Sequence, residues 1–124
     1  MAYFDLGFTY ASAGQYQAAL APYLQATRID PNFFAAYFNL GTALERVSNL
    51  KGAIESYQRA LRIHPDDPQT LYLLGDLYER AGNRPATFRA RCLFLQVAGD
   101  SMEKETITVK EKIRTMGECP RPKT

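Results

Sequence analysis

The stretch Ile29–Arg46, "IDPNFFAAYFNLGTALER", recurs with changes as Ile63–Arg80, "IHPDDPQTLYLLGDLYER". Each copy has Ile-x-Pro at its start and Leu-Gly at its centre, with the glycine ten residues after the proline. Proline starts or stops a helix because it lacks an N–H and fixes φ. Glycine inside a helix costs about 1 kcal/mol relative to alanine. A glycine kept at the same offset in both copies therefore indicates close helix–helix contact at that point.

The same spacing extends over most of the chain. Gly7, Gly41 and Gly75 are each separated by 34 residues. The other pairs with this spacing are Ala19 with Ala53, Tyr23 with Tyr57, Ala26 with Ala60, and Pro31 with Pro65. A fixed period of this length indicates an internal repeat.

Each period predicts two helices, because apolar residues recur at helical spacing on both sides of one break. The breaks are "SAGQ", "SN" and "AGNR", and Gly14 in the first of them suits a left-handed turn. We expect the repeated glycines to lie where the two helices meet, opposite Ala19 and Ala53. A single helical pair cannot bury its apolar stripe, so the pairs are expected to stack. The predicted helices cover residues 2–12, 16–27, 34–46, 51–63 and 68–80, with a sixth starting near residue 85.

These residues resemble the tetratricopeptide repeat (TPR) pattern of an aromatic, Leu-Gly, Tyr, Ala, an aromatic, Ala and Pro. The first copy matches at Tyr3, Leu6, Gly7, Tyr10, Ala19, Tyr23, Ala26 and Pro31. The second matches at Tyr37, Leu40, Gly41, Ala53, Tyr57, Ala60 and Pro65, with Leu44 in place of tyrosine, and the third keeps Leu74, Gly75 and Tyr78. The third then departs, with Thr87, Arg91, Phe94 and Gly99 at the remaining positions. The resemblance implies an all-α, right-handed α-solenoid of three helix-turn-helix hairpins.

A further helix is predicted to cap the third hairpin over about residues 101–116, started by Asp100 or Ser101 as N-cap. Its apolar stripe consists of Met102, Thr106, Val109, Ile113 and Met116. The predicted domain covers residues 1–116, with repeats at about 1–33, 34–67 and 68–100. Residues 117–124 are predicted to be disordered. The first repeat has no corresponding cap, so its apolar residues are expected to be partly bare.

Composition excludes several classes of protein. Fifteen Lys and Arg against thirteen Asp and Glu leave a net charge of +2, too near neutral to indicate nucleic-acid binding. No apolar run is long enough for a membrane span, and the N-terminus does not read as a signal peptide. Cys92 and Cys119 fit neither a metal site nor a disulfide framework. We therefore predict a buried thiol at Cys92, an exposed one at Cys119, and a reducing, cytoplasmic setting.

Nothing in the sequence indicates catalysis, and we predict no enzyme, no cofactor and no metal. His64 is the only histidine, and it is interpreted as a solvated residue at a helix end. The glycines follow the repeat and form no phosphate-binding loop. Arg84, Arg89 and Arg91 form a small basic cluster, for which a solvated helix face or a site for an acidic partner segment is preferred to nucleic acid.

The TPR resemblance implies a concave binding surface formed by the first helix of each hairpin. Phe4, Phe38 and Tyr72 are 34 residues apart and should form an aromatic ladder. Aromatic side chains suit peptide capture because they give large contact area at low entropic cost. The carboxylate clamp of some TPR co-chaperones is not expected, because only Asn39 matches its residues. The predicted peptide-binding groove consists of Phe4, Phe8, Phe38, Asn39, Thr42, Glu45, Arg46, Gln69, Tyr72, Leu73, Asp76, Glu79 and Arg80.

The function predicted from these features is a protein–protein interaction scaffold or adaptor that binds a peptide segment of a protein partner in the groove. The charged residues Glu45, Arg46, Asp76 and Glu79 are expected to provide selectivity. Three alternatives stay open. The chain is a chaperone for a hydrophobic client, like those of type III secretion; or a self-associating fragment whose uncapped first repeat docks on another copy; or a substrate-finding part of a larger enzyme.

Overall fold

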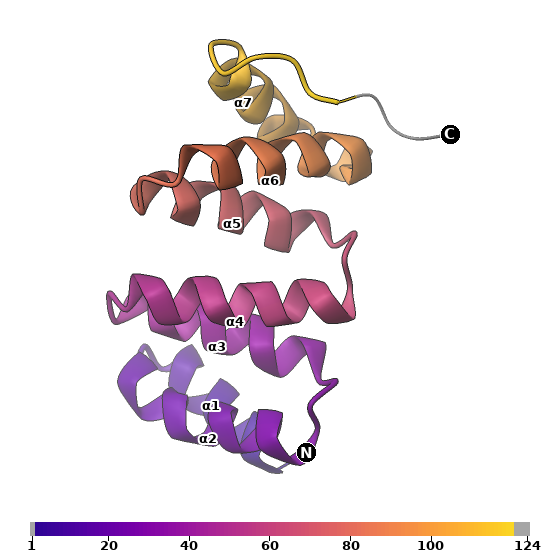
Figure 1. Cartoon of the computed structure of the whole chain (residues 1–124). Coiled ribbons are helices and arrows are strands. Elements are labelled where there is room, and N and C mark those ends of the chain that lie inside the picture. Colours follow the sequence, from indigo (N-terminus) through magenta and orange to yellow (C-terminus); the bar gives the residue numbers. More distant parts are fainter. Residues whose placement is uncertain (1, 121–124) are drawn as a thin grey trace. The chain divides into compact units, whose positions relative to one another are not determined.

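The computed structural model describes residues 2–120, and this part of the chain contains α-helices and one 3-10 turn but no strand. Figure 1 shows the helices in chain order. They are α1 (Ala2–Ser12), α2 (Tyr16–Ile29), α3 (Phe34–Arg46), α4 (Leu50–Ile63), α5 (Pro68–Arg80), α6 (Arg84–Val97) and α7 (Glu103–Ile113), with the 3-10 turn η1 (Asp100–Met102) before α7. None of the helices in the described range is long and apolar enough to cross a membrane.

The chain forms two compact units that meet in sequence at Pro65 and Asp66. In the first unit α1 packs on α2 and α3 packs on α4, and α2 also packs on α3. In the second unit α5 packs on α6, and α7 lies against α6. The predicted all-α pairing of consecutive helices is thus present in each unit.

The turn inside each hairpin has the same left-handed backbone. Gly14 and Gly82 have φ values of 78° and 76°, and Ser48, which is equally spaced between them in sequence, has a φ of 65°. Glycine adopts this conformation without steric cost, whereas a residue with a Cβ does so less readily. The break predicted at "SN" therefore uses the same turn geometry as the two glycine turns.

Polar side chains start three of the helices. Asn49 accepts a hydrogen bond from the Gly52 N–H at 2.9 Å, and Asn83 accepts one from the Ala86 N–H at 3.2 Å. Asp67 accepts from the Thr70 N–H at 3.0 Å, directly before the proline that opens α5. Such N-caps satisfy backbone donors that have no partner within the helix. They fix the starts of α4, α5 and α6 at or within one residue of the predicted positions.

The repeated glycines are sites of close helix contact, as predicted, but the groups they contact are tyrosine rings. A Cβ added to Gly7 would lie 2.7 Å from ring atoms of Tyr23, and one added to Gly41 would lie 2.9 Å from ring atoms of Tyr57. Both rings are almost completely buried. The expectation that alanines of the second helix are the nearest neighbours of these glycines is therefore wrong, because the nearest atoms belong to the tyrosine rings.

The buried cluster of the first unit lies between its two hairpins. It contains Ala19, Tyr23, Leu40 and Ala43. Leu40 is 4% exposed, whereas Leu6, one period earlier, is 45% exposed. The difference follows from the stacking, because Leu40 has a preceding hairpin to pack on. The prediction that apolar residues of the first repeat are partly bare is confirmed.

The capping helix differs from the prediction at its start. Asp100 and Ser101 lie in the turn η1 and do not cap α7, whose N-cap position is Met102 with no side-chain hydrogen bond. The centre of the predicted apolar stripe is confirmed, since Val109 and Ile113 are buried.

The cysteine prediction is wrong, because Cys92 and Cys119 form a disulfide. Cys92 lies on α6 and is buried, as expected. Cys119 follows α7, so the disulfide fixes the chain beyond that helix to α6. The argument from unpaired cysteines for a reducing compartment therefore no longer holds. Of the segment 117–124 that was predicted to be disordered, residues 117–120 have no regular secondary structure, and residues 121–124 lie outside the described residues.

Candidate functional site

The first unit contains a pocket of about 190 Å³ between its two hairpins. We call it the aromatic pocket. Its walls include Phe8, Ala11, Tyr16 and Tyr23 from the first hairpin, and Asn39 and Thr42 from α3. Phe8 is 55% exposed, so a large apolar side chain is available at the rim. Three of these residues, Phe8, Asn39 and Thr42, were predicted to belong to the groove.

Hydrogen bonds hold the polar residues of this pocket. The Thr42 hydroxyl donates to the Phe38 carbonyl at 3.2 Å and lies 2.9 Å from the Tyr57 hydroxyl. Since threonine has a single hydroxyl hydrogen, the Tyr57 hydroxyl is the donor to Thr42 in this arrangement. The Thr42 side chain is therefore held by its own helix, α3, and by Tyr57 of α4.

Burial keeps both core tyrosines neutral. It raises the pKa of Tyr57 to about 12, although the hydrogen bond with Thr42 acts in the opposite direction. Burial also raises the pKa of Tyr23, and a hydrogen bond with the Asn39 side chain partly offsets this. The pocket therefore presents neutral aromatic and amide groups, which suits an apolar side chain with one or two polar neighbours.

Each residue predicted for the aromatic ladder packs against at least one other ring. The Phe4 ring centroid lies 5.9 Å from that of Tyr23 and 4.8 Å from that of Phe33. Phe38 repeats this arrangement with an edge contact to Tyr57 at 5.5 Å. Such ring pairs stabilise by about 0.5–1.5 kcal/mol beyond the area they bury. The ring positions are therefore set before any ligand binds.

Arg46, another predicted groove residue, lies at the edge of the same unit. Its guanidinium carbon is 5.6 Å from the centroid of the Tyr16 ring. A cation over an aromatic face is attracted by the ring quadrupole. This contact fixes Arg46 close to a wall of the aromatic pocket.

The second unit contains a larger pocket, of about 480 Å³, where α7 lies against the third hairpin. We call it the ionic pocket. Its walls include Glu79 from α5, Arg84, Thr87 and Arg91 from α6, and Lys112 and Thr115 from α7 and the turn after it. Only Glu79 among these was predicted as a groove residue.

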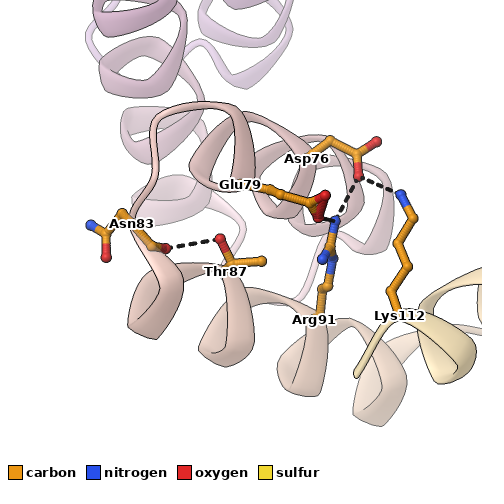
Figure 2. A network of polar contacts seen from close by, with 6 residues as sticks. All are labelled: Asp76, Glu79, Asn83, Thr87, Arg91 and Lys112. Carbon is orange, nitrogen blue, oxygen red and sulfur yellow. Dashed lines mark hydrogen bonds and ion pairs between the residues drawn. The ribbon is translucent and has the colours of Figure 1, made fainter. Parts of the chain in front are cut away.

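An ion-pair network lies in the wall of the ionic pocket, and Figure 2 shows it from close by. The Arg91 side chain is 3% exposed, and its Nη2 lies 3.0 Å from Asp76 Oδ1 and 2.6 Å from Glu79 Oε2. Lys112 Nζ lies 3.5 Å from the same Asp76 oxygen. Asp76 and Glu79 are thus held by cations of their own unit. Their predicted role in selecting a partner has to operate through this network.

The interpretation of the basic cluster needs correction at one residue. Arg84 and Arg89 are exposed, as a solvated helix face requires, but Arg91 is buried and paired. Its aliphatic stem lies over Gly75, where an added Cβ would be 3.1 Å from Arg91 Cγ. Arg91 therefore fills the space that the tyrosine rings fill in the first two hairpins.

The two pockets occupy the same position in the repeat. Three wall residues of one pocket lie two periods from three wall residues of the other, so these three pairs can be compared. The chemistry changes from aromatic and small to charged: Ala11 corresponds to Glu79, Tyr16 to Arg84, and Tyr23 to Arg91.

The remaining predicted groove residues lie in varied environments. The Tyr72 ring packs on Phe94 at 5.5 Å. Gln69 and Arg80 are exposed, whereas Glu45 and Leu73 are partly buried. The prediction missed Tyr16, Tyr23, Arg84, Arg91 and Lys112 as pocket residues. Two signals in the sequence marked some of them: the basic cluster contains Arg84 and Arg91, and Arg91 also departs from the repeat pattern.

The described residues contain no group of three or more His, Cys, Asp and Glu residues that could hold a metal ion. His64 is exposed at the end of α4, and its ring lies 4.7 Å from that of Phe34. This agrees with its interpretation as a solvated residue at a helix end.

Comparison with known proteins gives both a family and a fold. A family model described as TPR repeat matches residues 7–47 and 48–82. No curated protein sequence matches significantly. Several solved structures share the fold, which confirms the predicted class of all-α helical repeat.

Two of these structures are of chaperones with peptides or binding regions of other proteins. The Yersinia enterocolitica type III secretion chaperone SycD, with a peptide of the translocator YopD, has a TM-score of 0.82 and 14% identity over 92% of this chain and 88% of that chain. PcrH, with the chaperone-binding region of PopD, has a TM-score of 0.80 and 14% identity over 91% and 86%. MamA has a TM-score of 0.75 and 21% identity over 89% and 73%.

Proposed function

The chain belongs to the TPR repeat family, and on that premise we propose that it is a non-catalytic protein–protein interaction scaffold that binds a peptide segment of a partner protein. The observation that carries the proposal is the aromatic pocket. It combines three aromatic side chains with the polar groups of Asn39 and Thr42, and Phe8 is accessible at its rim. The pocket is suited to an aromatic or branched aliphatic side chain flanked by backbone.

The wider set of groove residues extends this proposal. In the first unit Phe4 and Phe38 would add aromatic contacts and Glu45 and Arg46 polar ones, and in the second unit Tyr72 and Arg80 are the corresponding candidates. Because a short peptide buries limited area, an affinity of about micromolar is expected.

A peptide-display selection tests the proposal directly. The full chain is the bait, and the Phe8→Glu variant is used in parallel. Leu24→Glu is the matched control, because Leu24 is a 43% exposed apolar residue of the same hairpin that does not line the pocket. We expect peptides with a shared apolar anchor to be enriched on the wild type and on Leu24→Glu, but not on Phe8→Glu.

A result in which the three baits enrich the same peptides would contradict binding at the aromatic pocket. A result in which no bait enriches any sequence would contradict peptide binding by the chain. Circular dichroism of each bait, recorded before selection, shows whether its helices are intact.

A second candidate function is a chaperone for a hydrophobic client segment, as in type III secretion. It is supported by the likeness to SycD and PcrH, whose structures contain a peptide of the translocator YopD and the chaperone-binding region of PopD. MamA has the same fold, so the likeness alone does not separate the two functions. A chaperone would keep an aggregation-prone hydrophobic client soluble on co-expression, whereas a scaffold would bind a soluble peptide without that effect.

Self-association through the first repeat is a third candidate. It is supported by the exposed apolar side chains Tyr3 and Leu6, each 45% exposed on α1. Sedimentation over a range of concentrations tests it, because association makes the apparent mass rise with concentration. A Leu6→Glu variant is expected to abolish any such rise.

A further inference from the structure

The ionic pocket has a net positive charge even though two carboxylates lie in its network. Arg84, Arg91 and Lys112 provide three positive charges, and Asp76 and Glu79 provide two negative ones. Arg91 contacts both carboxylates and Lys112 contacts Asp76, so these two cations together balance the two carboxylates. The excess of one positive charge corresponds to Arg84 on α6, and Lys112 on α7 is the more weakly paired of the other two cations.

The cations of Arg84 and Lys112 remain accessible. Arg84 is exposed, and the Lys112 side chain is 40% exposed with its Nζ 3.5 Å from Asp76 Oδ1. At this distance the lysine is at the limit of hydrogen bonding, so an incoming oxygen acceptor can compete for it. Arg91 differs, since it is buried and has a 2.6 Å contact with Glu79. It positions the wall and does not need to bind the ligand.

Hydroxyl groups complete the lining. Thr115 lies on the wall beside Lys112, and the Thr87 hydroxyl donates to the Asn83 carbonyl at 2.8 Å. Thr87 and Arg91 lie on the same side of α6 in Figure 2, and Asn83 directly precedes that helix. A guanidinium, an ammonium and a threonine hydroxyl around one cavity form a set of donors that matches a carboxylate.

We propose that the ionic pocket binds a carboxylate side chain of an acidic segment in the partner peptide, held by Arg84 and Lys112. The inference rests on the proposed function, because it gives that function a second, charged subsite. The aromatic pocket, at the same repeat position in the first unit, would take an apolar residue. Arg84 and Arg91 lie two periods after Tyr16 and Tyr23, and this exchange of tyrosine for arginine would then distinguish the specificity of the two pockets.

The test uses ¹⁵N-labelled full chain with its disulfide intact. Three probes are titrated at constant ionic strength: an acetylated and amidated triglutamate peptide, the triglutamine peptide of equal shape, and inorganic phosphate. We expect saturable shifts with triglutamate in the amides of residues 82–87 and 112–116, and none with triglutamine. The triglutamate affinity should fall as salt is raised, because salt screens exposed charges.

The variants are chosen as a matched set. Arg84→Gln with Lys112→Gln removes the two pocket cations. Arg89→Gln with Lys110→Gln removes two exposed cations from the same helices outside the pocket. We expect the first pair to weaken triglutamate binding at least about tenfold, the loss expected from charge-assisted hydrogen bonds, and the second to change it less than about twofold.

Several results would overturn the proposal. They are equal shifts with triglutamine, equal losses in the two variant pairs, shifts outside the ionic pocket, or no shift at all. Phosphate binding as tight as triglutamate binding would assign the pocket to small anions instead of a peptide. None of these results bears on the aromatic pocket, and the display selection with Phe8→Glu is independent of them.

Discussion

Replacing the repeated glycines by alanine gives a graded prediction about stability. In an isolated helix this substitution stabilises by about 1 kcal/mol. At Gly41 the new Cβ would lie 2.9 Å from two ring atoms of Tyr57, whereas carbon atoms pack best at about 3.5–4.0 Å. The ring therefore has to move by several tenths of an ångström.

Tyr57 has little freedom to make that movement. Its ring is completely buried, its hydroxyl lies 2.9 Å from the Thr42 hydroxyl, and Phe38 packs on its edge. Overpacking of this kind costs about 1–3 kcal/mol, and a weakened hydrogen bond adds about 1 kcal/mol. After subtraction of the helix gain, Gly41→Ala should destabilise the first unit by about 1–3 kcal/mol.

Gly75 offers the contrast. Its nearest neighbour is the Cγ of Arg91 at 3.1 Å, a single stem carbon at a longer distance than the two Tyr57 ring atoms, so a smaller shift relieves the contact. Gly75→Ala should therefore change the stability of the second unit by less than about 1 kcal/mol, because the helix gain offsets most of the crowding. The two substitutions have the same chemistry in the same repeat position, so each is a control for the other.

The assay is urea unfolding followed by circular dichroism, with hydrogen exchange of α3 and α5 to assign each change to its unit. Adding Tyr57→Leu to Gly41→Ala should recover at least about 1 kcal/mol relative to the sum of the single changes, since neighbouring residues couple. An unchanged or more stable Gly41→Ala protein would refute the packing role of the glycine. So would a loss at Gly75→Ala as large as that at Gly41→Ala.

Three further predictions concern the second unit and the core tyrosine. The double variant Asp76→Asn with Glu79→Gln should destabilise the second unit by about 3 kcal/mol, because it leaves the buried Arg91 charge unpaired. Arg91→Met should cost less, since water can solvate both carboxylates. The midpoints of urea unfolding measure both losses of stability. Reducing the disulfide, whose cysteines are 27 residues apart, should cost about 3–4 kcal/mol by the loop-entropy relation and raise hydrogen exchange in α7 but not in α1–α4. The pKa of Tyr57 is raised from 10.0 to about 12 in the folded protein, so on raising the pH the unfolded chain loses the Tyr57 proton first. The contribution of this group to the free energy of unfolding is therefore complete below pH 10 and is lost as the pH rises towards 12. Tyr57→Phe should reduce the alkaline loss of stability measured in thermal melts.

The first six helices could be predicted from the sequence because two independent signals locate each of them. The 34-residue period sets where a helix lies, and Pro, Gly or Asn marks its ends. Asn49, Asp67 and Asn83 place polar acceptors at three helix starts. At α7 only one mark exists, since the period has ended. The apolar stripe through Val109 and Ile113 placed the helix correctly, but the competing caps Asp100 and Ser101 lie in the turn η1.

The disulfide could not be predicted, because two cysteines that far apart in sequence carry no information on their distance in space. Cys92 lies on α6, and Cys119 reaches it only because the chain turns back after α7. The direction of that turn depends on how α7 packs on α6. Local propensity does not determine this packing.

The candidate site could be predicted in part. The repeat position placed Phe8, Asn39 and Thr42 on one surface, and the structure brings them to one pocket. Tyr23 stood in the sequence only as a match to the repeat pattern, and the structure places it both in the core and in the pocket wall. Arg91 was visible as a departure from the pattern, but its partners Asp76 and Glu79 had been assigned to ligand recognition. Only the side-chain distances show that Arg91 pairs with these two carboxylates.

The measurement that most directly tests the central proposal is the affinity of one display-selected peptide for three proteins. Fluorescence anisotropy with a labelled copy of that peptide gives a Kd for the wild type, for Phe8→Glu and for Leu24→Glu. We predict a roughly micromolar Kd for the wild type and for Leu24→Glu, and a Kd at least about tenfold higher for Phe8→Glu, because hot-spot aromatic residues contribute more than 1 kcal/mol to binding. Equal Kd values for the three proteins would contradict peptide binding at the aromatic pocket.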